Sequence, residues 1–570
     1  MYLNNNLYIA HSAEGPINLV GKMCNRHGLI AGATGTGKTV SLQVMAETFS
    51  QAGVPCFMAD MKGDLSGISQ AGKTSGFIEK RCAEFGIENP QYQACPVRFF
   101  DVYGEQGYPL RTTISQMGPQ LLSRLMELNE TQAGVLNIVF RIADDKQLLL
   151  IDMKDLRVML DFVGKNASMF TTQYGNITTA SIGAIQRAVL ALESEGGDKF
   201  FGEPAFNVMD LIAQEDGKGV MSVLTADKLM LHPKLYSTFL LWMMTELYAT
   251  LPEVGDLELP KLIFFFDEAH MLFDGTSKAL VEKLEQVIRL IRSKGVGIYF
   301  ITQSPTDIPD DILGQLGNRV QHALRAYTPK DQKAVRAAAE TFRANPAFDT
   351  EEAIKELATG EALVSVLDEK GAPTVVQRVK MLFPLSQIGA ITAGQRLDIN
   401  NAAPENIKAY EKYFDRESAY EMIVAKQQQE EEKALAERKA KEEEKQKAAQ
   451  QKEAEKLQKE QEKLQKAAAK EAEKAQKEAE KEAARQAKEE KAQKASSGWK
   501  RTIFGTLATA VIGSLARSFG SSIGKSITGS SSSKKSSTST GRSIAGKAAQ
   551  SATTAVTRKV TQEVLKSIFK

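Results

Sequence analysis

Residues 29 to 39 of the chain read Leu29-Ile30-Ala31-Gly32-Ala33-Thr34-Gly35-Thr36-Gly37-Lys38-Thr39. A short apolar run leads into a glycine-rich turn, and a helical pattern with Val40, Leu42 and Val44 follows it. Residues 32–39 fit the pattern G-x-x-x-x-G-K-[ST] without deviation, in the strand–loop–helix context that the motif requires. The stretch therefore predicts a P-loop between a buried strand and a helix.

Each residue type in this loop suits phosphate. Glycines let the backbone curl so that successive N–H groups face an anion at a helix N-terminus, which already favours negative charge. Lys38 can place a point charge on the β- and γ-phosphates, and the Thr39 hydroxyl can bind Mg²⁺. The predicted cofactors are ATP and Mg²⁺. The residues expected to bind the nucleotide are Gly32, Ala33, Thr34, Gly35, Thr36, Gly37, Lys38 and Thr39.

A second motif lies where a later apolar strand ends. The run Leu262–Phe266 is followed by Asp267 and Glu268. Asp267, at the carboxyl end of this strand, is expected to face the metal. Glu268 is expected to polarise the attacking water as a general base. An apolar strand followed by Asp-Glu is common by itself, but paired with a P-loop it indicates hydrolysis of ATP.

Other polar residues come after the next strands. Gln303 follows the run Val296–Thr302 and is placed to sense the γ-phosphate or orient water; the alternative is an ordinary strand cap. A planar guanidinium suits the charge of phosphoryl transfer, so an arginine could complete a neighbouring subunit's site. Arg319 is the first choice and Arg325 the second, with surface or ion-pair roles as the alternative for each. Arg289 and Arg292 are further candidates.

The remaining apolar runs predict the fold class. Runs of this length separated by helical patterns favour an α/β fold with buried parallel strands over an antiparallel sandwich. Residues 1–400 are expected to form the ATPase domain, with a helical insertion at about 104–215. The eight runs are Leu29–Ala31, Val54–Asp60, Val97–Val102, Val220–Leu224, Leu262–Asp267, Val296–Thr302, Val320–Arg325 and Ala362–Leu367.

The composition changes abruptly after a connector at 401–425. Residues 426–494 are almost wholly Lys, Glu, Ala, Gln and Arg, which have high helix propensity and form Glu–Lys pairs along a helix. Only Leu435, Leu457 and Leu464 could form a seam. This spacing favours a long solvated helix over a coiled coil.

The last segment, 495–570, is strongly basic. It carries 12 Lys or Arg residues and one acid, Glu563, against a net charge of +2 for the whole chain. Two amphipathic patterns surround a Ser-rich linker, so residues 496–570 are expected to dock on an anionic membrane or a protein partner. Docking on the body or on a neighbouring subunit is the alternative. With no signal peptide or long apolar segment, the sequence predicts a cytoplasmic protein, peripheral at the membrane or nucleoid.

Several longer stretches, spread over residues 1–400, resemble the bacterial HerA-like ATPases of the YjgR type, in the HerA/FtsK branch of P-loop NTPases. They are DMKGDLSG (60–67), FFFDEAH (264–270), RLIRSKGVGIYFITQSP (289–305) and LGNRVQHALRAYTPKDQKAV (316–335). The resemblance implies a RecA-like core with an additional strand between the two Walker elements. It also implies a hexameric ring whose sites are shared between subunits, with Gln303 and Arg319 matching family positions.

The resemblance has a limit at the N-terminus. Archaeal HerA carries a β-barrel before its ATPase domain, whereas about 28 residues precede the P-loop strand here, room for a hairpin. Three functions stay open from the sequence. The first is a helicase-like motor that moves double-stranded DNA. The second is a membrane-tethered ATPase that remodels or pumps protein. The third is a nucleotide-gated scaffold, against which Glu268 argues.

Overall fold

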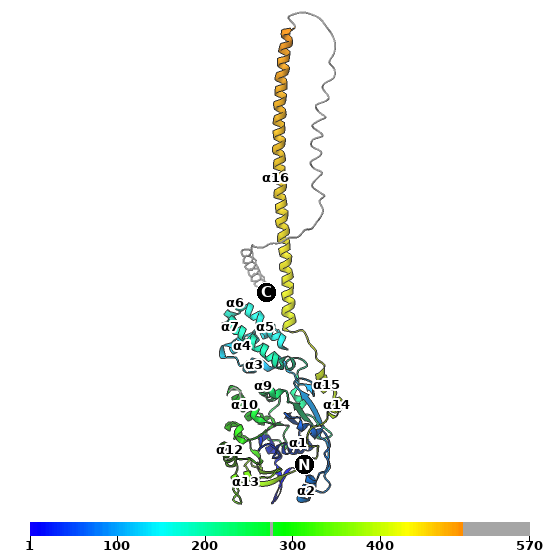
Figure 1. Cartoon of the computed structure of the whole chain (residues 1–570), viewed down its shortest axis with the longest axis vertical. Coiled ribbons are helices and arrows are strands. Elements are labelled where there is room, and N and C mark those ends of the chain that lie inside the picture. Colours follow the sequence, from blue (N-terminus) through cyan, green and yellow to red (C-terminus); the bar gives the residue numbers. More distant parts are fainter. Residues whose placement is uncertain (274–277, 494–570) are drawn as a thin grey trace. The chain divides into compact units, whose positions relative to one another are not determined.

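The computed structural model describes residues 1–273 and 278–493. The chain divides into two compact units, Met1–Ala425 and Lys426–Lys570. The first unit is a mixed α/β body, and Figure 1 labels many of its helices. The second contains most of one long helix. The predicted basic tail, 495–570, lies outside the described residues.

The strands of the described residues form one large sheet and one small hairpin. The large sheet has 13 strands within that part of the chain, and β8 and β9 pair separately. The strands are β1 (Tyr2–Leu3), β2 (Asn6–Ser12), β3 (Gly15–Leu19), β4 (Gly28–Ala31), β5 (Cys56–Asp60), β6 (Val97–Asp101), β7 (Tyr108–Pro109), β8 (Gln214–Glu215), β9 (Lys218–Gly219), β10 (Met221–Thr225), β11 (Leu262–Phe266), β12 (Val296–Thr302), β13 (Asn318–Gln321), β14 (Glu361–Ser365) and β15 (Gln377–Met381).

The core of the sheet is parallel, in the order β13-β4-β12-β11-β5-β10-β6-β7. Strands β4, β5, β10, β11 and β12 are buried along their whole length, as continuous apolar runs require. Strand β12 lies between the P-loop strand β4 and the acid-bearing strand β11, which is the additional strand expected from the resemblance. The predicted α/β class with a parallel-rich sheet is confirmed.

Two strand predictions need correction. The run Ala362–Leu367 was expected to be parallel, but β14 pairs antiparallel with β13. A buried apolar run looks the same in either direction, because burial on both faces sets its pattern. The run Val320–Arg325 was expected to be a strand throughout, but β13 ends at Gln321. The next residue, His322, contacts Ser41 on the helix that follows the P-loop. The N-terminal hairpin of β2 and β3 continues the antiparallel side of the sheet through β15.

The helices of the body flank this sheet. In Figure 1, helices α3 to α7 cluster together, and they occupy the range predicted for the helical insertion. The helices are α1 (Lys38–Gln51), α2 (Gly76–Phe85), α3 (Ile114–Leu125), α4 (Glu130–Asp145), α5 (Met153–Lys165), α6 (Ala167–Tyr174), α7 (Thr179–Leu192), α8 (Asp198–Phe200), α9 (Pro233–Thr250), α10 (Lys278–Ile291), α11 (Asp310–Leu313), α12 (Pro329–Glu340), α13 (Thr350–Glu356), α14 (Ala393–Ala402), α15 (Glu405–Lys408) and α16 (Ala419–Gln493).

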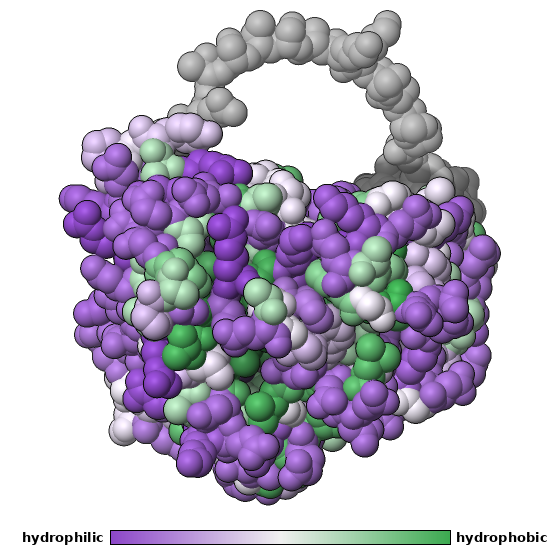
Figure 2. All heavy atoms as spheres, turned by 90° about the horizontal axis from the view of Figure 1, so that it is seen from below, coloured by the Kyte–Doolittle hydropathy of each residue, from purple (hydrophilic) through white to green (hydrophobic). Residues whose placement is uncertain are grey.

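The surface of the body is mainly hydrophilic when seen from the end where α2 and α13 lie, with scattered apolar side chains in its middle (Figure 2). Polar residues on the outside and apolar strands on the inside are what a sheet buried between helices requires. The sheet is therefore the centre of the body's core.

Helix α16 has 75 residues, which corresponds to about 110 Å at a rise of 1.5 Å per residue. Leu435, Leu457 and Leu464 are exposed in it. The pairing of this helix with another copy, as in a coiled coil, stays a prediction. Among the helices of residues 1–273 and 278–493, none is both long and apolar enough to cross a bilayer.

Candidate nucleotide-binding site

A cavity of about 330 Å³ lies at the carboxyl ends of β4, β5 and β11. Parallel strands place the residues that follow them at the same edge of the sheet, and this edge is where α/β proteins bind ligands. The P-loop forms one wall, and residues that follow β5 and β11 face it. The cavity is lined by Thr34, Gly35, Gly37, Lys38, Thr39, Val40, Gln43, Lys62, Asp64, Asp267, Glu268, Thr359, Ile388 and Gly389.

The P-loop is held in place by main-chain contacts to three neighbouring segments. The N–H of Gly32 donates to the carbonyl of Thr302, and that of Ala33 to the carbonyl of Ala323. The carbonyl of Thr36 accepts from the N–H of Gly360. Because Gly32, Ala33 and Thr36 make these contacts, they support the loop from behind, while the other five predicted residues line the cavity.

Helix α1 begins directly at the cavity. Gly37, with φ of 116°, precedes its first residue, and within the described chain no side chain caps this helix end. The first N–H groups of an uncapped helix lack intrahelical partners and attract anions. Lys38 Nζ donates to the carbonyls of Gly32 (2.7 Å) and Ala33 (3.2 Å), so its charge lies along the loop. Burial lowers the pKa of Lys38, against the opposing effect of Glu268 and Asp267. This wall fits a polyphosphate.

The two acids after β11 differ in their surroundings. Asp267 is buried, and burial together with the charge of Glu268 raises its pKa to about 7. Its Oδ1 accepts a hydrogen bond from the N–H of Glu268 (2.9 Å), which has a left-handed φ of 48°. Asp267 and the Thr39 hydroxyl line the same cavity, and both are oxygen ligands of the kind that Mg²⁺ prefers. These residues fit the predicted metal.

Both carboxylate oxygens of Glu268 have partners. Lys62 Nζ lies 2.6 Å from Oε1, and Gln303 Nε2 lies 3.5 Å from Oε2. Burial raises the pKa of Glu268, but the bond and charge of Lys62 outweigh it and the pKa is lowered overall. The structure thus brings Gln303 to the acid pair, as the order of strands β11 and β12 requires.

Lys62 and Asp64 are site residues that the sequence did not indicate. Both follow β5, which is the neighbour of β11 in the sheet, so they enter the cavity beside the acids. Both residues belong to the stretch DMKGDLSG, which carries part of the family resemblance. Asp60 in the same stretch accepts the Gly63 N–H, and burial raises its pKa to about 6.

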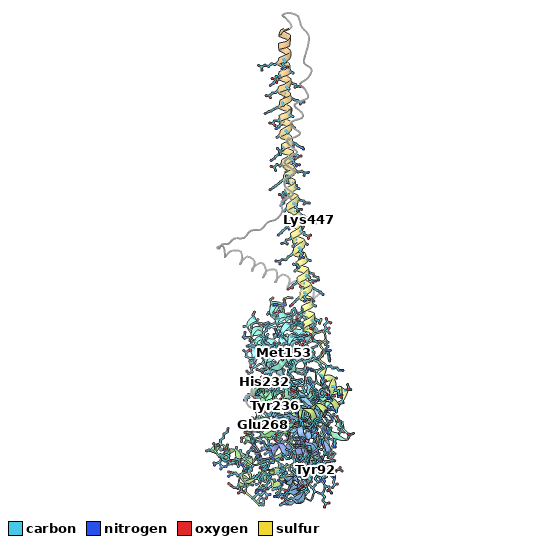
Figure 3. The ribbon with its side chains drawn as sticks, turned by 45° about the vertical axis from the view of Figure 1, so that its right-hand side comes forward. Tyr92, Met153, His232, Tyr236, Glu268 and Lys447 are labelled. Carbon is cyan, nitrogen blue, oxygen red and sulfur yellow. The ribbon has the colours of Figure 1, made fainter. Side chains whose placement is uncertain are left out.

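Helix α9 carries a buried tyrosine close enough to Asp267 to feel its charge. Tyr236 on this helix is fully buried, and Figure 3 labels it in the same part of the body as Glu268. Burial and the nearby charge of Asp267 raise the pKa of the Tyr236 hydroxyl. The Tyr236 hydroxyl therefore stays neutral beside Asp267.

His322 is a second supporting residue that the sequence did not indicate. Its Nε2 lies 2.8 Å from Ser41 Oγ on α1, and its Nδ1 lies 2.8 Å from the carbonyl of Glu361. Burial lowers its pKa to about 4. A neutral histidine therefore braces the P-loop helix against the ends of β13 and β14.

The two predicted arginines do not reach this cavity in their own chain. Arg319 pairs with Leu29 across the sheet, three residues before the P-loop, and its guanidinium donates to the carbonyls of Leu313, Leu316 and Thr341. It lines a different cavity, of about 770 Å³, together with Arg26, Arg289 and Arg292. Arg325 is exposed and donates to the carbonyl of Lys355 (3.1 Å).

Comparison with solved structures gives distant likenesses. The bacterial conjugative coupling protein TrwBdeltaN70 is 14% identical, with a TM-score of 0.45 over 69% of this chain and 92% of that one. The plasmid coupling protein TrwB in complex with ADP and Mg²⁺ is 14% identical, with a TM-score of 0.43 over 64% and 88%. VirB4 of Thermoanaerobacter pseudethanolicus is 14% identical, with a TM-score of 0.43 over 66% and 96%.

Sequence comparison identifies the family. No curated protein matches the chain. Residues 5–511 match the family described as helicase HerA-like C-terminal, which is most of the sequence and includes every site residue named above. The chain belongs to the helicase HerA-like C-terminal family and is a P-loop ATPase.

Proposed function

We propose that this chain hydrolyses ATP with Mg²⁺ as a homo-oligomeric, hexameric ring that moves along double-stranded DNA. One observation carries the hydrolytic part of this proposal. Lys38, Thr39, Asp267 and Glu268 come from two distant parts of the sequence and line one cavity. A phosphate-binding wall opposite two carboxylates is the arrangement that hydrolysis of a nucleoside triphosphate requires.

Each residue has a separate role in the proposed reaction. Lys38 and the N-terminus of α1 bind the phosphates. Thr39 and Asp267 hold Mg²⁺, which when bound would neutralise charge on the β- and γ-phosphates. Glu268 accepts a proton from the attacking water, and Gln303, 3.5 Å from its Oε2, orients that water.

The position of the arginines supports a site shared between subunits. Within residues 1–273 and 278–493, the cavity at the P-loop contains two lysines but no arginine. The arginine-lined cavity around Arg319 lies toward the amino ends of the same strands. A neighbouring copy could present that face to the nucleotide of the next copy, as a ring places unlike faces together. Arg319, on that face, is the first candidate for this role. Arg325, exposed after the end of β13, is the second candidate.

The experiment is a measurement of ATP turnover by the full chain, with and without duplex DNA, beside a mass measurement in ATP. The proposal expects turnover that requires Mg²⁺, stimulation by duplex DNA and a mass of six subunits. Glu268→Gln should slow turnover by at least about 10²-fold while ATP still binds. A variant with wild-type turnover would remove Glu268 from its role as the base. A wild-type chain that binds ATP without turnover would favour the nucleotide-gated scaffold.

The outcome with DNA decides between the two remaining functions. Turnover that duplex DNA leaves unchanged would reject the DNA motor. The membrane-tethered alternative then predicts that deletion of 496–570 abolishes association with anionic vesicles or a protein partner and leaves basal turnover intact.

A further inference from the structure

The Glu268 carboxylate is fully engaged in this structure. Lys62 Nζ lies 2.6 Å from Oε1. On the other side, Gln303 Nε2 and His270 Nδ1 each lie 3.5 Å from Oε2. A carboxylate oxygen that accepts a short bond from an ammonium group does not accept a proton from water at the same place. The base of the proposed reaction is therefore held by a residue from the neighbouring strand.

Lys62 is able to leave this position. Its side chain is 53% exposed, whereas that of Glu268 is 10% exposed. A lysine carries its charge on a flexible four-carbon stem, so Nζ can move without a change in the main chain. Lys62 and the P-loop residues Gly35 and Lys38 line the same cavity, which is where the phosphates of the nucleotide would lie. The phosphate oxygens and Glu268 thus compete for one ammonium group.

We propose that Lys62 is a positioning residue that exchanges partners when a triphosphate enters the site. Without a triphosphate, Lys62 pairs with Glu268 Oε1 and blocks it. With a triphosphate, Lys62 Nζ moves to a phosphate oxygen, and Oε1 becomes free to accept the hydrogen bond of the attacking water. No covalent bond forms or breaks in this exchange. The inference rests on the proposed role of Glu268 as the general base.

The exchange of partners by Lys62 should make the site bind a triphosphate more tightly than a diphosphate. A diphosphate lacks the outermost, charged group, so it competes less well with the carboxylate for Lys62. Lys38 differs from Lys62 here, because its Nζ already lies along the loop carbonyls of Gly32 and Ala33. Loss of Lys62 is therefore expected to affect binding of ATP more than binding of ADP.

The test is equilibrium binding of fluorescent N-methylanthraniloyl ATP and ADP, with Mg²⁺, to the full chain. Lys62→Met should weaken ATP binding by about tenfold and ADP binding by less than about twofold, as expected for the loss of one charged hydrogen bond. Lys62→Arg keeps the charge and should bind ATP nearly as the wild type does. Lys73→Met removes a nearby exposed lysine outside the cavity and serves as the matched control.

The link between the two residues gives a second readout. Glu268→Gln removes the competing charge, so it should tighten ATP binding several-fold in the wild-type background. In the Lys62→Met background the same change should have no effect. An equal effect of Glu268→Gln in both backgrounds, or equal losses of ATP and ADP in Lys62→Met, would overturn the exchange. A wild-type chain that neither binds nor hydrolyses ATP would instead reject the proposed function itself.

Discussion

His322 Nε2 lies 2.8 Å from Ser41 Oγ, and this contact joins the end of β13 to helix α1 behind the P-loop. The imidazole is fully buried, and its Nδ1 contacts the carbonyl of Glu361. Ser41 is two residues after the predicted Mg²⁺ ligand Thr39. The P-loop helix is therefore supported by a residue that does not itself line the cavity.

This buried imidazole predicts a loss of stability in mild acid. Burial lowers the pKa of His322 to about 4 in the folded state, whereas an unfolded histidine titrates near 6.5. The unfolded chain therefore binds the extra proton between these values. Stability from this group is complete above about pH 6.5 and is lost as pH falls toward 4, by at most about 3 kcal/mol.

Urea unfolding of the wild type at pH 7.5 and 4.5 measures this loss. In His322→Gln, the free energy of unfolding should fall by about 3 kcal/mol less between these two pH values than in the wild type. A loss remains in that variant, because burial also lowers the pKa of His27 to about 4. His232→Gln, at a partly exposed histidine, is the control and should follow the wild type. The idea fails if His322→Gln and the wild type lose equal stability.

Gly32 admits no side chain. A Cβ added there would come within 2.5 Å of His322 Cβ, and its φ of 154° is also rare for other residues. Gly32→Ala should therefore lower the free energy of unfolding by about 2–4 kcal/mol, since overpacking and backbone strain add. Gly217→Ala is the matched control, because Gly217 has a positive φ but open space around it. Equal costs for both variants would show that the contact with His322 contributes nothing.

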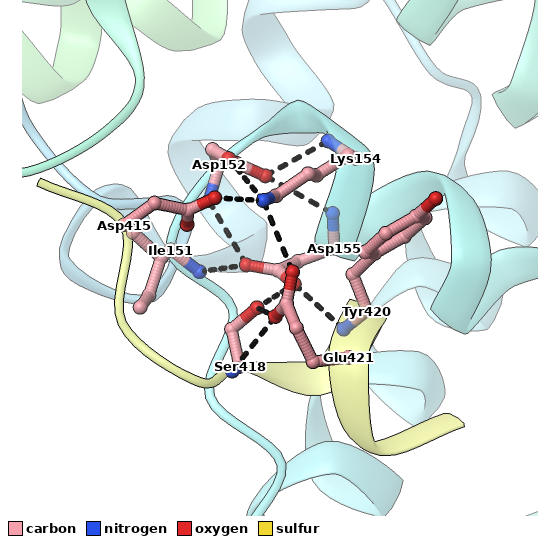
Figure 4. A network of polar contacts seen from close by, with 8 residues as sticks. All are labelled: Ile151, Asp152, Lys154, Asp155, Asp415, Ser418, Tyr420 and Glu421. Carbon is pink, nitrogen blue, oxygen red and sulfur yellow. Dashed lines mark hydrogen bonds and ion pairs between the residues drawn. The ribbon is translucent and has the colours of Figure 1, made fainter. Parts of the chain in front are cut away.

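A buried carboxylate fastens the start of α16 to helix α5 (Figure 4). Asp155 Oδ1 accepts from Ser418 Oγ (2.5 Å) and from the N–H of Tyr420 (2.8 Å), and Oδ2 accepts from the N–H of Ile151 (2.8 Å). Lys154, beside it, forms ion pairs with Asp415 and Glu421. The insertion and the first turn of α16 therefore share one polar network inside the body.

Removal of this carboxylate should release the first turn of α16. Asp155→Ala removes the acceptor of the N–H groups of Ile151, Asp152 and Tyr420, at a cost of about 1–3 kcal/mol for each donor that water does not reach. The Ser418 hydroxyl keeps a second acceptor in Glu421. Limited trypsin digestion should then cleave faster at Lys412 and Arg416. Asp161→Ala, on the same helix but at a partly exposed residue, is the control. Unchanged cleavage in Asp155→Ala would show that the network does not hold this segment.

The arginine assignment can be tested by mixing subunits. Arg319→Ala and Lys38→Ala should each lose about 10³-fold in turnover when alone. If Arg319 serves a neighbour, rings that contain both variants have some complete sites, and mixing should restore measurable turnover. A mixture that stays inactive contradicts the role of Arg319. Recovery in the same experiment with Arg325→Ala would assign the role to Arg325.

The elements around the nucleotide could be predicted from the order of residues alone. Its glycine pattern predicted the P-loop, and the apolar run before Asp267 and Glu268 predicted the strand that places them. Both signals are local, because turn geometry and burial of a strand act on neighbouring residues. The apolar runs also predicted most strands of the parallel core. They contain no information on the direction of β14, because a buried strand is apolar in either direction.

Which residues meet at the cavity follows from the three-dimensional fold. Lys62 reaches Glu268 because β5 and β11 are neighbours in the sheet, although 206 positions separate the two residues. His322 supports α1 because β13 lies beside β4, and for the same reason Arg319 lies toward the opposite ends of the strands. The order of strands follows from the packing of the whole domain, so no local pattern contains it.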